Sequence, residues 1–78
     1  MTRKKALAII EEIFKSILDD EDLVISEDTE FKDIEGFDSV MQITMIGSLE
    51  SELGRKFSLK EMVGLKNVHQ LVDMVTKK

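Results

Sequence analysis

Gly36-Phe37-Asp38-Ser39-Val40 marks the point where a long acidic connection gives way to an apolar helical pattern. Aliphatic residues at helical spacing follow Ser39, so the serine stands at the predicted N-terminus of a helix. The positive end of a helix dipole favours anions, and a phosphate attached to this hydroxyl would be stabilised there. Because the rest of the chain holds few groups capable of chemistry, the functional interpretation depends on Ser39.

Downstream of this boundary, the spacing predicts a helix over residues 39–53. Gly54 fits the position just after it, where a left-handed backbone closes a helix. Gly47 lies inside the helix, where glycine costs about 1 kcal/mol relative to alanine. It either permits close packing or a cavity between helices, or it is simply tolerated. The predicted buried stripe, with Met45 beside it, is aliphatic: Val40, Ile43, Ile46, Leu49 and Leu53.

Three further segments have helical spacing or capping signals. The first begins after Thr2, a plausible N-cap, and ends at the acidic run 19–22. Its stripe comprises Ala6, Ile10, Ile13, Phe14, Ile17 and Leu18. Ser58 and Glu61 form a capping-box pattern that opens a short segment before Gly64.

The last helix opens at Asn67-Val68-His69-Gln70, which has a related capping spacing. Its predicted stripe comprises Val68, Leu71, Val72 and Val75. Lys77 and Lys78 stand at its C-terminus, where cations are favoured. The chain is thus predicted to be one all-α domain over residues 1–78, a small bundle of three main helices and one short helix.

The predicted connection between the first two helices covers residues 19–38. A stretch of that length without regular structure is unusual in a compact domain and often functional. Apolar residues are expected to anchor it to the core: Leu23, Val24, Ile25, Phe31, Ile34 and Phe37. Gly36 supplies a backbone position that tolerates positive φ.

Composition narrows the functional classes. The net charge is −5, and ten carboxylates lie within residues 19–38 against Lys32 alone. A nucleic-acid binder needs a basic stripe, and none is present. The acidic half either suits a basic protein partner or simply keeps the domain in solution. The absence of cysteine excludes a disulfide framework and a cysteine-based metal site. With no leader-like segment and no apolar run of about 20 residues, we expect a soluble, cytoplasmic monomer without a membrane span.

Ser39 has two structural interpretations. It is either the N-cap, paired with Gln42 in a capping box, or the first helical residue behind an Asp38 cap. Catalysis by Ser39 is not supported, because His69 is the only histidine and no Gly-x-Ser-x-Gly motif surrounds the serine. His69 is expected to be a surface residue. The acidic run 19–22 lacks the spacing and central glycine of a calcium loop, so no metal site is predicted.

At this point the sequence resembles the acyl carrier proteins, whose pattern is Asp-Ser followed by an aliphatic residue. The resemblance covers roughly residues 5–76. Besides Asp38-Ser39-Val40 it includes the acidic loop with Phe31 and the last helix from Asn67. It also includes the end of the second helix and the aromatic residue after it: Leu49, Glu50, Glu52 and Phe57.

The resemblance implies a carrier and not an enzyme. A phosphopantetheinyl transferase would attach 4′-phosphopantetheine from coenzyme A to Ser39 and would recognise Asp38. The terminal thiol of the arm would hold acyl groups as thioesters for acyl-loading and acyl-transfer enzymes, as in fatty acid, lipid or polyketide biosynthesis. The alternative is a small helical interaction module that binds its partner through the acidic loop and the methionine-bearing helix, with Ser39 as a plain cap.

The second helix departs from the family pattern. Carriers of bacterial fatty acid synthesis present a ladder of acidic residues there, whereas this chain has no carboxylate from Val40 to Leu49. The departure favours a specialised carrier, with partner-binding residues Val40, Met41, Met45 and Glu35. An acyl-chain pocket between helices, if present, would be lined by Met45, Ile46, Met62 and Val63.

Overall fold

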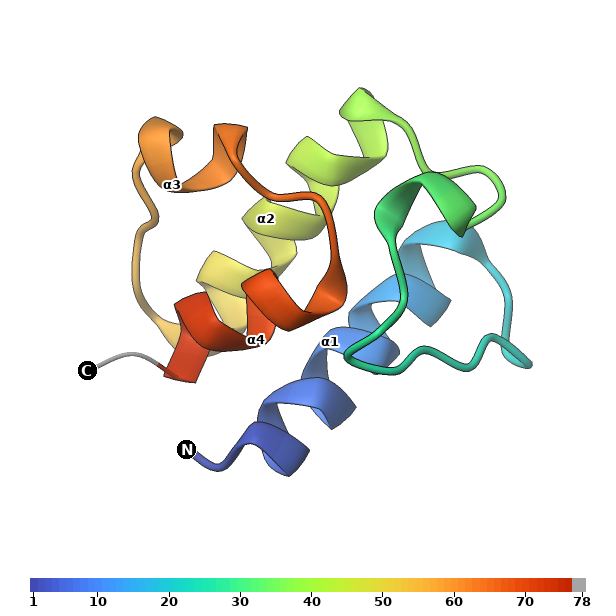
Figure 1. Cartoon of the computed structure of the whole chain (residues 1–78), viewed down its shortest axis with the longest axis horizontal. Helices are drawn as coiled ribbons and strands as arrows, with labels where there is room; N and C mark the ends of the chain where they lie inside the picture. The colour runs from blue at the N-terminus through green and yellow to red at the C-terminus, as the bar shows by residue number, and fades with distance from the viewer. Residues whose placement is uncertain (77–78) are drawn as a thin grey trace.

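The computed structural model describes residues 1–76, apart from the side chain of Leu59. The helices are α1 (Arg3–Leu18), α2 (Ser39–Leu53), α3 (Leu59–Val63) and α4 (Val68–Thr76), with a 3-10 turn η1 (Phe31–Asp33) between α1 and α2 (Figure 1). No strand occurs among the described residues, which hold one isolated antiparallel bridge between Glu30 and Asn67. The prediction of an all-α bundle with three main helices and one short helix is confirmed.

The first two helices begin and end at signals present in the sequence. Thr2 caps α1, because its hydroxyl accepts a hydrogen bond from the Lys5 N–H at 3.1 Å. The helix ends at Asp19, whose φ of 51° places it in the left-handed region. α2 ends at Gly54 with φ 66°, as its sequence position predicted.

The caps of the last two helices are also confirmed. Ser58 and Glu61 form both hydrogen bonds of the capping box of α3. The side-chain oxygen of Asn67 accepts a hydrogen bond from the Gln70 N–H at 2.8 Å, at the start of α4. Lys77 and Lys78, expected at the C-terminus of α4, lie outside the described residues.

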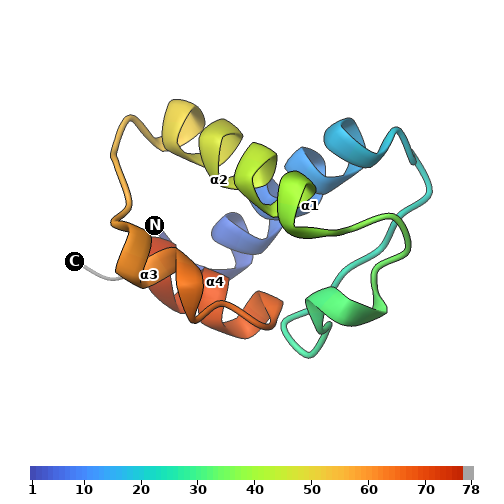
Figure 2. The same ribbon diagram turned by 90° about the horizontal axis from the view of Figure 1, so that it is seen from above.

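α1 packs against both α2 and α4. Seen from above, α2 lies along the upper edge of the molecule and α3 and α4 lie along the lower edge (Figure 2). The largest fully buried side chains come from α1, α2 and α4: Phe14, Ile10, Met45, Leu49, Leu71, Val68 and Val72. The predicted core faces of α1 and α4 are therefore confirmed.

The predicted buried stripe of α2 is wrong in its first turn and a half. Val40 is 68% exposed and Ile43 is 72% exposed. α2 is apolar on several sides near its N-terminus, so periodicity could not select one face. α2 packs against α1, and its side chains of Met45 and Leu49 are buried in the core, whereas those of Val40 and Ile43 lie in solvent.

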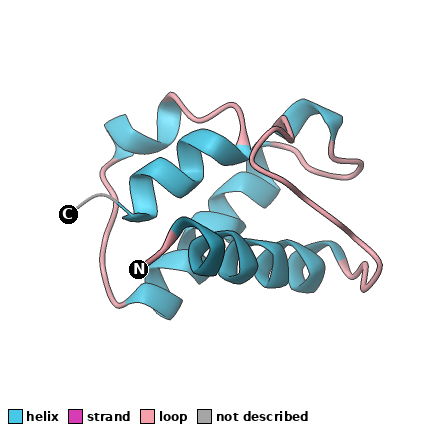
Figure 3. Ribbon diagram, turned by 60° about the horizontal axis from the view of Figure 1, so that its bottom comes forward, coloured by secondary structure: helices cyan, strands magenta, loops and turns pink. Residues whose placement is uncertain are grey.

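The connection between α1 and α2 is mostly loop (Figure 3), and aromatic packing holds it to the core. The rings of Phe14, Phe31 and Phe37 have centroids 5.0–6.0 Å apart in tilted arrangements, which are favourable for aromatic pairs. Ile25 and Ile34 are buried as expected. Val24 is 82% exposed, so its predicted anchoring role is wrong.

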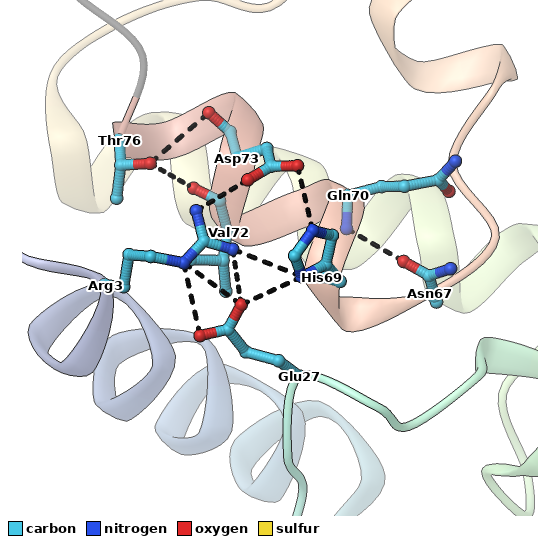
Figure 4. Close-up of polar contacts among 8 residues, drawn as sticks. All are labelled: Arg3, Glu27, Asn67, His69, Gln70, Val72, Asp73 and Thr76. Carbon is cyan, nitrogen blue, oxygen red and sulfur yellow. Dashed lines mark hydrogen bonds and ion pairs between the residues drawn. The ribbon is translucent and has the colours of Figure 1, made fainter.

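Backbone hydrogen bonds join the same connection to the start of α4. The Phe31 N–H donates to the Lys66 carbonyl and the Val68 N–H donates to the Thr29 carbonyl, each at 2.9 Å. A charged cluster adds to this attachment, because Glu27 of the connection contacts both Arg3 of α1 and His69 of α4 (Figure 4). The connection is therefore an ordered segment that is bonded to two helices.

Gly47 faces open space. A Cβ atom built at this position would meet nothing within 4 Å. Close packing against another helix therefore does not explain this glycine, and of the predicted explanations only simple tolerance fits the surroundings. None of the described helices has the length and apolar character needed to cross a membrane.

Candidate functional site

The cap of α2 leaves Ser39 free. The Asp38 carboxylate accepts a hydrogen bond from the Met41 N–H at 2.9 Å, and the Asp38 carbonyl accepts the first helical bond from the Gln42 N–H at 2.9 Å. Ser39 is the first helical residue and is exposed. Within residues 1–76, no hydrogen bond involves its hydroxyl. The second predicted interpretation is confirmed, and a Ser39–Gln42 capping box is wrong.

The surroundings of the Ser39 hydroxyl favour an anion. Within the described part of the chain, the backbone N–H groups of Ser39 and Val40 have no acceptor, as expected in the first turn of a helix. These amides and the helix dipole favour negative charge at this end by about 0.3–1 kcal/mol. The Asp38 carboxylate bonds the Met41 N–H, which leaves the two earlier amides available.

The loop before α2 aims Ser39 outward. Gly36 has φ 82°, a backbone conformation that L side chains rarely adopt, and a Cβ there would lie 3.7 Å from the Leu18 side chain. Phe37 turns toward the core and packs its ring 5.0 Å from that of Phe14. Anchoring Phe37 directs the following residues, Asp38 and Ser39, into solvent.

Two hollows adjoin this site. The aliphatic hollow, about 270 Å³, lies beside Ser39 between α2 and α3, and its lining is Ser39, Gln42, Ile43, Ile46, Met62 and Val63. The charged hollow, about 530 Å³, lies beside Asp38, and its lining is Glu30, Phe31, Lys32, Phe37, Asp38, Gln42, Leu65 and Lys66. Neither hollow was predicted with these boundaries.

The aliphatic hollow corresponds in part to the predicted pocket. Ile46, Met62 and Val63 line it as expected. Met45 does not, because its side chain is fully buried in the core. The same burial makes Met45 wrong as a partner-contacting residue.

The other predicted partner residues lie at the surface. Val40 and Glu35 are exposed, and Met41 is partly buried. Ile43 and Val63, 72% and 75% exposed, extend the apolar surface around Ser39. Sequence reasoning missed Ile43 because it had been placed in the buried stripe. Contact between these residues and a partner stays a prediction.

Comparison with known proteins agrees with this geometry. The family model of the phosphopantetheine attachment site matches residues 8–75. A solved structure, the solution NMR structure of a holo acyl carrier protein from Geobacter metallireducens, superposes with a TM-score of 0.84 at 38% sequence identity. The match covers 94% of this chain and 84% of that chain. No curated protein matches the chain at a significant level.

The chain therefore belongs to the acyl carrier protein family, the carriers that hold phosphopantetheine covalently. Members of this family are carriers without catalytic activity of their own. They serve as substrates for phosphopantetheinyl transferases and as partners for acyl-handling enzymes.

Proposed function

We propose that this protein carries acyl groups on a phosphopantetheine arm attached to Ser39 and presents them to the enzymes of a specialised pathway. The observation that carries the proposal is that the N-cap of α2 and the candidate attachment site are two different residues, Asp38 and Ser39. Asp38 caps the helix, so the exposed Ser39 hydroxyl has no structural hydrogen bond to lose on modification. An interaction module with Ser39 as a plain cap is disfavoured for the same reason.

The residues at the start of α2 are suited to hold a phosphopantetheine arm. The Ser39 Oγ would hold the phosphate, and the free N–H groups of Ser39 and Val40 lie at the same helix end. The aliphatic hollow, which Ser39 itself borders, offers apolar surface next to the attachment point. When bound, the arm supplies a terminal thiol that holds acyl groups as thioesters, which a chain without cysteine cannot do by itself.

Attachment needs a separate enzyme. Transfer from coenzyme A forms the bond between Ser39 Oγ and phosphorus, breaks the pyrophosphate bond and releases adenosine 3′,5′-bisphosphate. The hydroxyl proton passes to a base of the transferase, since this chain offers no histidine near Ser39. We include Asp38 in the surface that the transferase recognises, because its carboxylate is exposed directly beside the reacting hydroxyl.

The surface of α2 supports a specialised pathway. No carboxylate occurs from Val40 to Leu49, and the exposed side chains of Val40 and Ile43 on this helix are aliphatic. A partner that docks here would use apolar contact with Val40, Ile43 and Val63 in place of a basic patch. Polyketide, modified-lipid and amino-acid or hydroxy-acid transfer systems are the pathway classes we propose.

The test uses intact mass. The purified apo protein is incubated with coenzyme A and a broad-specificity transferase, and we expect the mass to increase by one phosphopantetheine. Ser39→Ala should show no increase, whereas Ser51→Ala, an exposed serine on the same helix, should be modified like the wild type. A folded wild-type protein that stays unmodified would contradict the proposal and favour the interaction module.

A further inference from the structure

Gln42 occupies a special position beside Ser39. It lies one turn further along α2 and, among the residues that the structure describes, it alone lines both the aliphatic hollow and the charged hollow. Its side-chain amide Nε2 donates a hydrogen bond to the Met62 carbonyl at 3.2 Å. The side chain therefore spans from α2 to α3 and stands between the two hollows.

The acceptor of this bond is itself well placed. The Met62 carbonyl lies in the last turn of α3 and also accepts the Leu65 N–H at 3.2 Å. Leu65 is buried and belongs to the lining of the charged hollow, while Met62 belongs to that of the aliphatic hollow. Gln42 is thus bonded at the boundary between the two linings.

The two hollows differ in chemistry. Beyond Ser39 and Gln42, the described residues that line the aliphatic hollow are all apolar. The charged hollow contains two carboxylates and two ammonium groups, of which Lys32 and Glu30 approach to 3.7 Å. An alkyl chain gains free energy by leaving water in the first hollow, and it would have to desolvate charged groups in the second.

We propose that the Gln42 side chain is a wall that confines an acyl chain, carried on the arm at Ser39, to the aliphatic hollow and keeps it out of the charged one. The inference rests on the proposed attachment at Ser39. Gln42 acts as a positioning residue and takes no part in bond making. The space that this side chain leaves open to the acyl chain is lined by Ile43, Ile46 and Val63, which favour the alkyl part of the cargo.

The experiment compares amide chemical shifts in protein loaded from coenzyme A with those in protein loaded from hexanoyl-coenzyme A. In the wild type, we expect the hexanoyl group to change the amide chemical shifts of Ile46 and Val63, which line the aliphatic hollow. The amide chemical shifts of Phe31 and Lys66, which line the charged hollow, should stay the same. In Gln42→Ala, shifts should appear on both sides. Taking the difference within each variant removes the direct effect of the substitution.

A second variant tests whether any amide side chain at position 42 is enough, or whether it must be long enough to reach the Met62 carbonyl. Gln42→Asn keeps an amide but is one methylene shorter, so it should lose the bond to Met62 and behave like Gln42→Ala. Thr44→Ala is the matched control, because Thr44 lies on α2, lines neither hollow and bonds only to the Val40 carbonyl of its own helix. It should show the wild-type pattern.

Two results would contradict the proposed role of Gln42. One is a wild-type chain that shifts the charged side as strongly as the aliphatic side, or shifts neither. The other is a pair of Gln42 variants that keep the wild-type pattern. Intact mass of each sample keeps these outcomes apart from the attachment itself. Absence of the mass increase in the wild type refutes modification, whereas a modified protein with the wrong shift pattern refutes only the wall.

Discussion

The guanidinium of Arg3 and the carboxylate of Glu27 form a bidentate ion pair across 24 residues of sequence, with Arg3 Nε 3.1 and 3.3 Å from the two carboxylate oxygens. Arg3 also contacts Asp73 of α4 at 2.6 Å. His69 completes the cluster, with its two ring nitrogens 3.1 Å from Glu27 and 3.4 Å from Asp73. The start of α1, the connection and α4 therefore meet at one set of charges (Figure 4).

The first prediction concerns this cluster. We expect Arg3→Gln to lower the thermal unfolding midpoint, because two carboxylates lose their shared cation. The loss should shrink as salt concentration rises, since the groups are partly exposed and salt screens their interaction. Lys4→Gln is the matched control, an exposed cation one residue away that takes part in no ion pair within residues 1–76. Equal effects of the two variants at low salt would show that net charge, and not the pairing, matters.

The second prediction concerns pH. Hydrogen bonds from Arg3 hold the pKa of Glu27 below its usual value, and they do the same for Asp73. A carboxyl group with a lowered folded-state pKa stabilises the fold above its unfolded pKa and loses this contribution as pH falls through the folded value. The difference in thermal unfolding midpoint between the wild type and Arg3→Gln should therefore be largest at neutral pH. It should decline below the usual carboxyl values of 4.5 and 3.8. A difference that grew in acid would contradict the pairing.

The third prediction uses Gly47, inside α2, and Gly54, which directly follows its last residue. Gly47→Ala should stabilise the protein by about 0.5–1 kcal/mol, because alanine restricts the unfolded chain and its methyl group meets no atom within 4 Å. Gly54→Ala should destabilise it by about 1–2 kcal/mol, since φ 66° is unfavourable for a residue with a Cβ. Urea unfolding of both variants measures the two signs. Stabilisation by both would mean that the left-handed closure of α2 does not matter.

The fourth prediction separates the two roles of Asp38. Asp38→Asn keeps an oxygen for the Met41 N–H, so stability should change by less than about 0.5 kcal/mol, whereas Asp38→Ala should lose about 1 kcal/mol with the cap. If the transferase reads the negative charge, both variants should be modified at Ser39 more slowly than the wild type. Wild-type kinetics for Asp38→Asn in the mass assay would limit Asp38 to the cap.

The helices and their ends could be predicted from the sequence, because they are determined by interactions between residues close in the chain. Thr2, Ser58 and Asn67 each bond an N–H within three residues, and Gly54 needs only its own backbone freedom. The bounds of α2 follow from the same kind of signal. The candidate attachment residue was equally visible, since an exposed serine at a helix start depends on its immediate neighbours.

Tertiary packing decided which sides of those helices meet. Val40, Ile43 and Met45 are all apolar and all lie on α2, yet of these three only Met45 is buried in the core, and the other two lie in solvent. Likewise, the contacts of Arg3 with Glu27 and of Gln42 with Met62 join residues 24 and 20 positions apart. Such pairs carry no local periodicity, because their distance is set by how the helices pack. The sequence by itself therefore determined a capped bundle with a serine at the start of its second helix. Only the folded arrangement showed that Asp38 is the cap and produced the two hollows and the side chain that separates them.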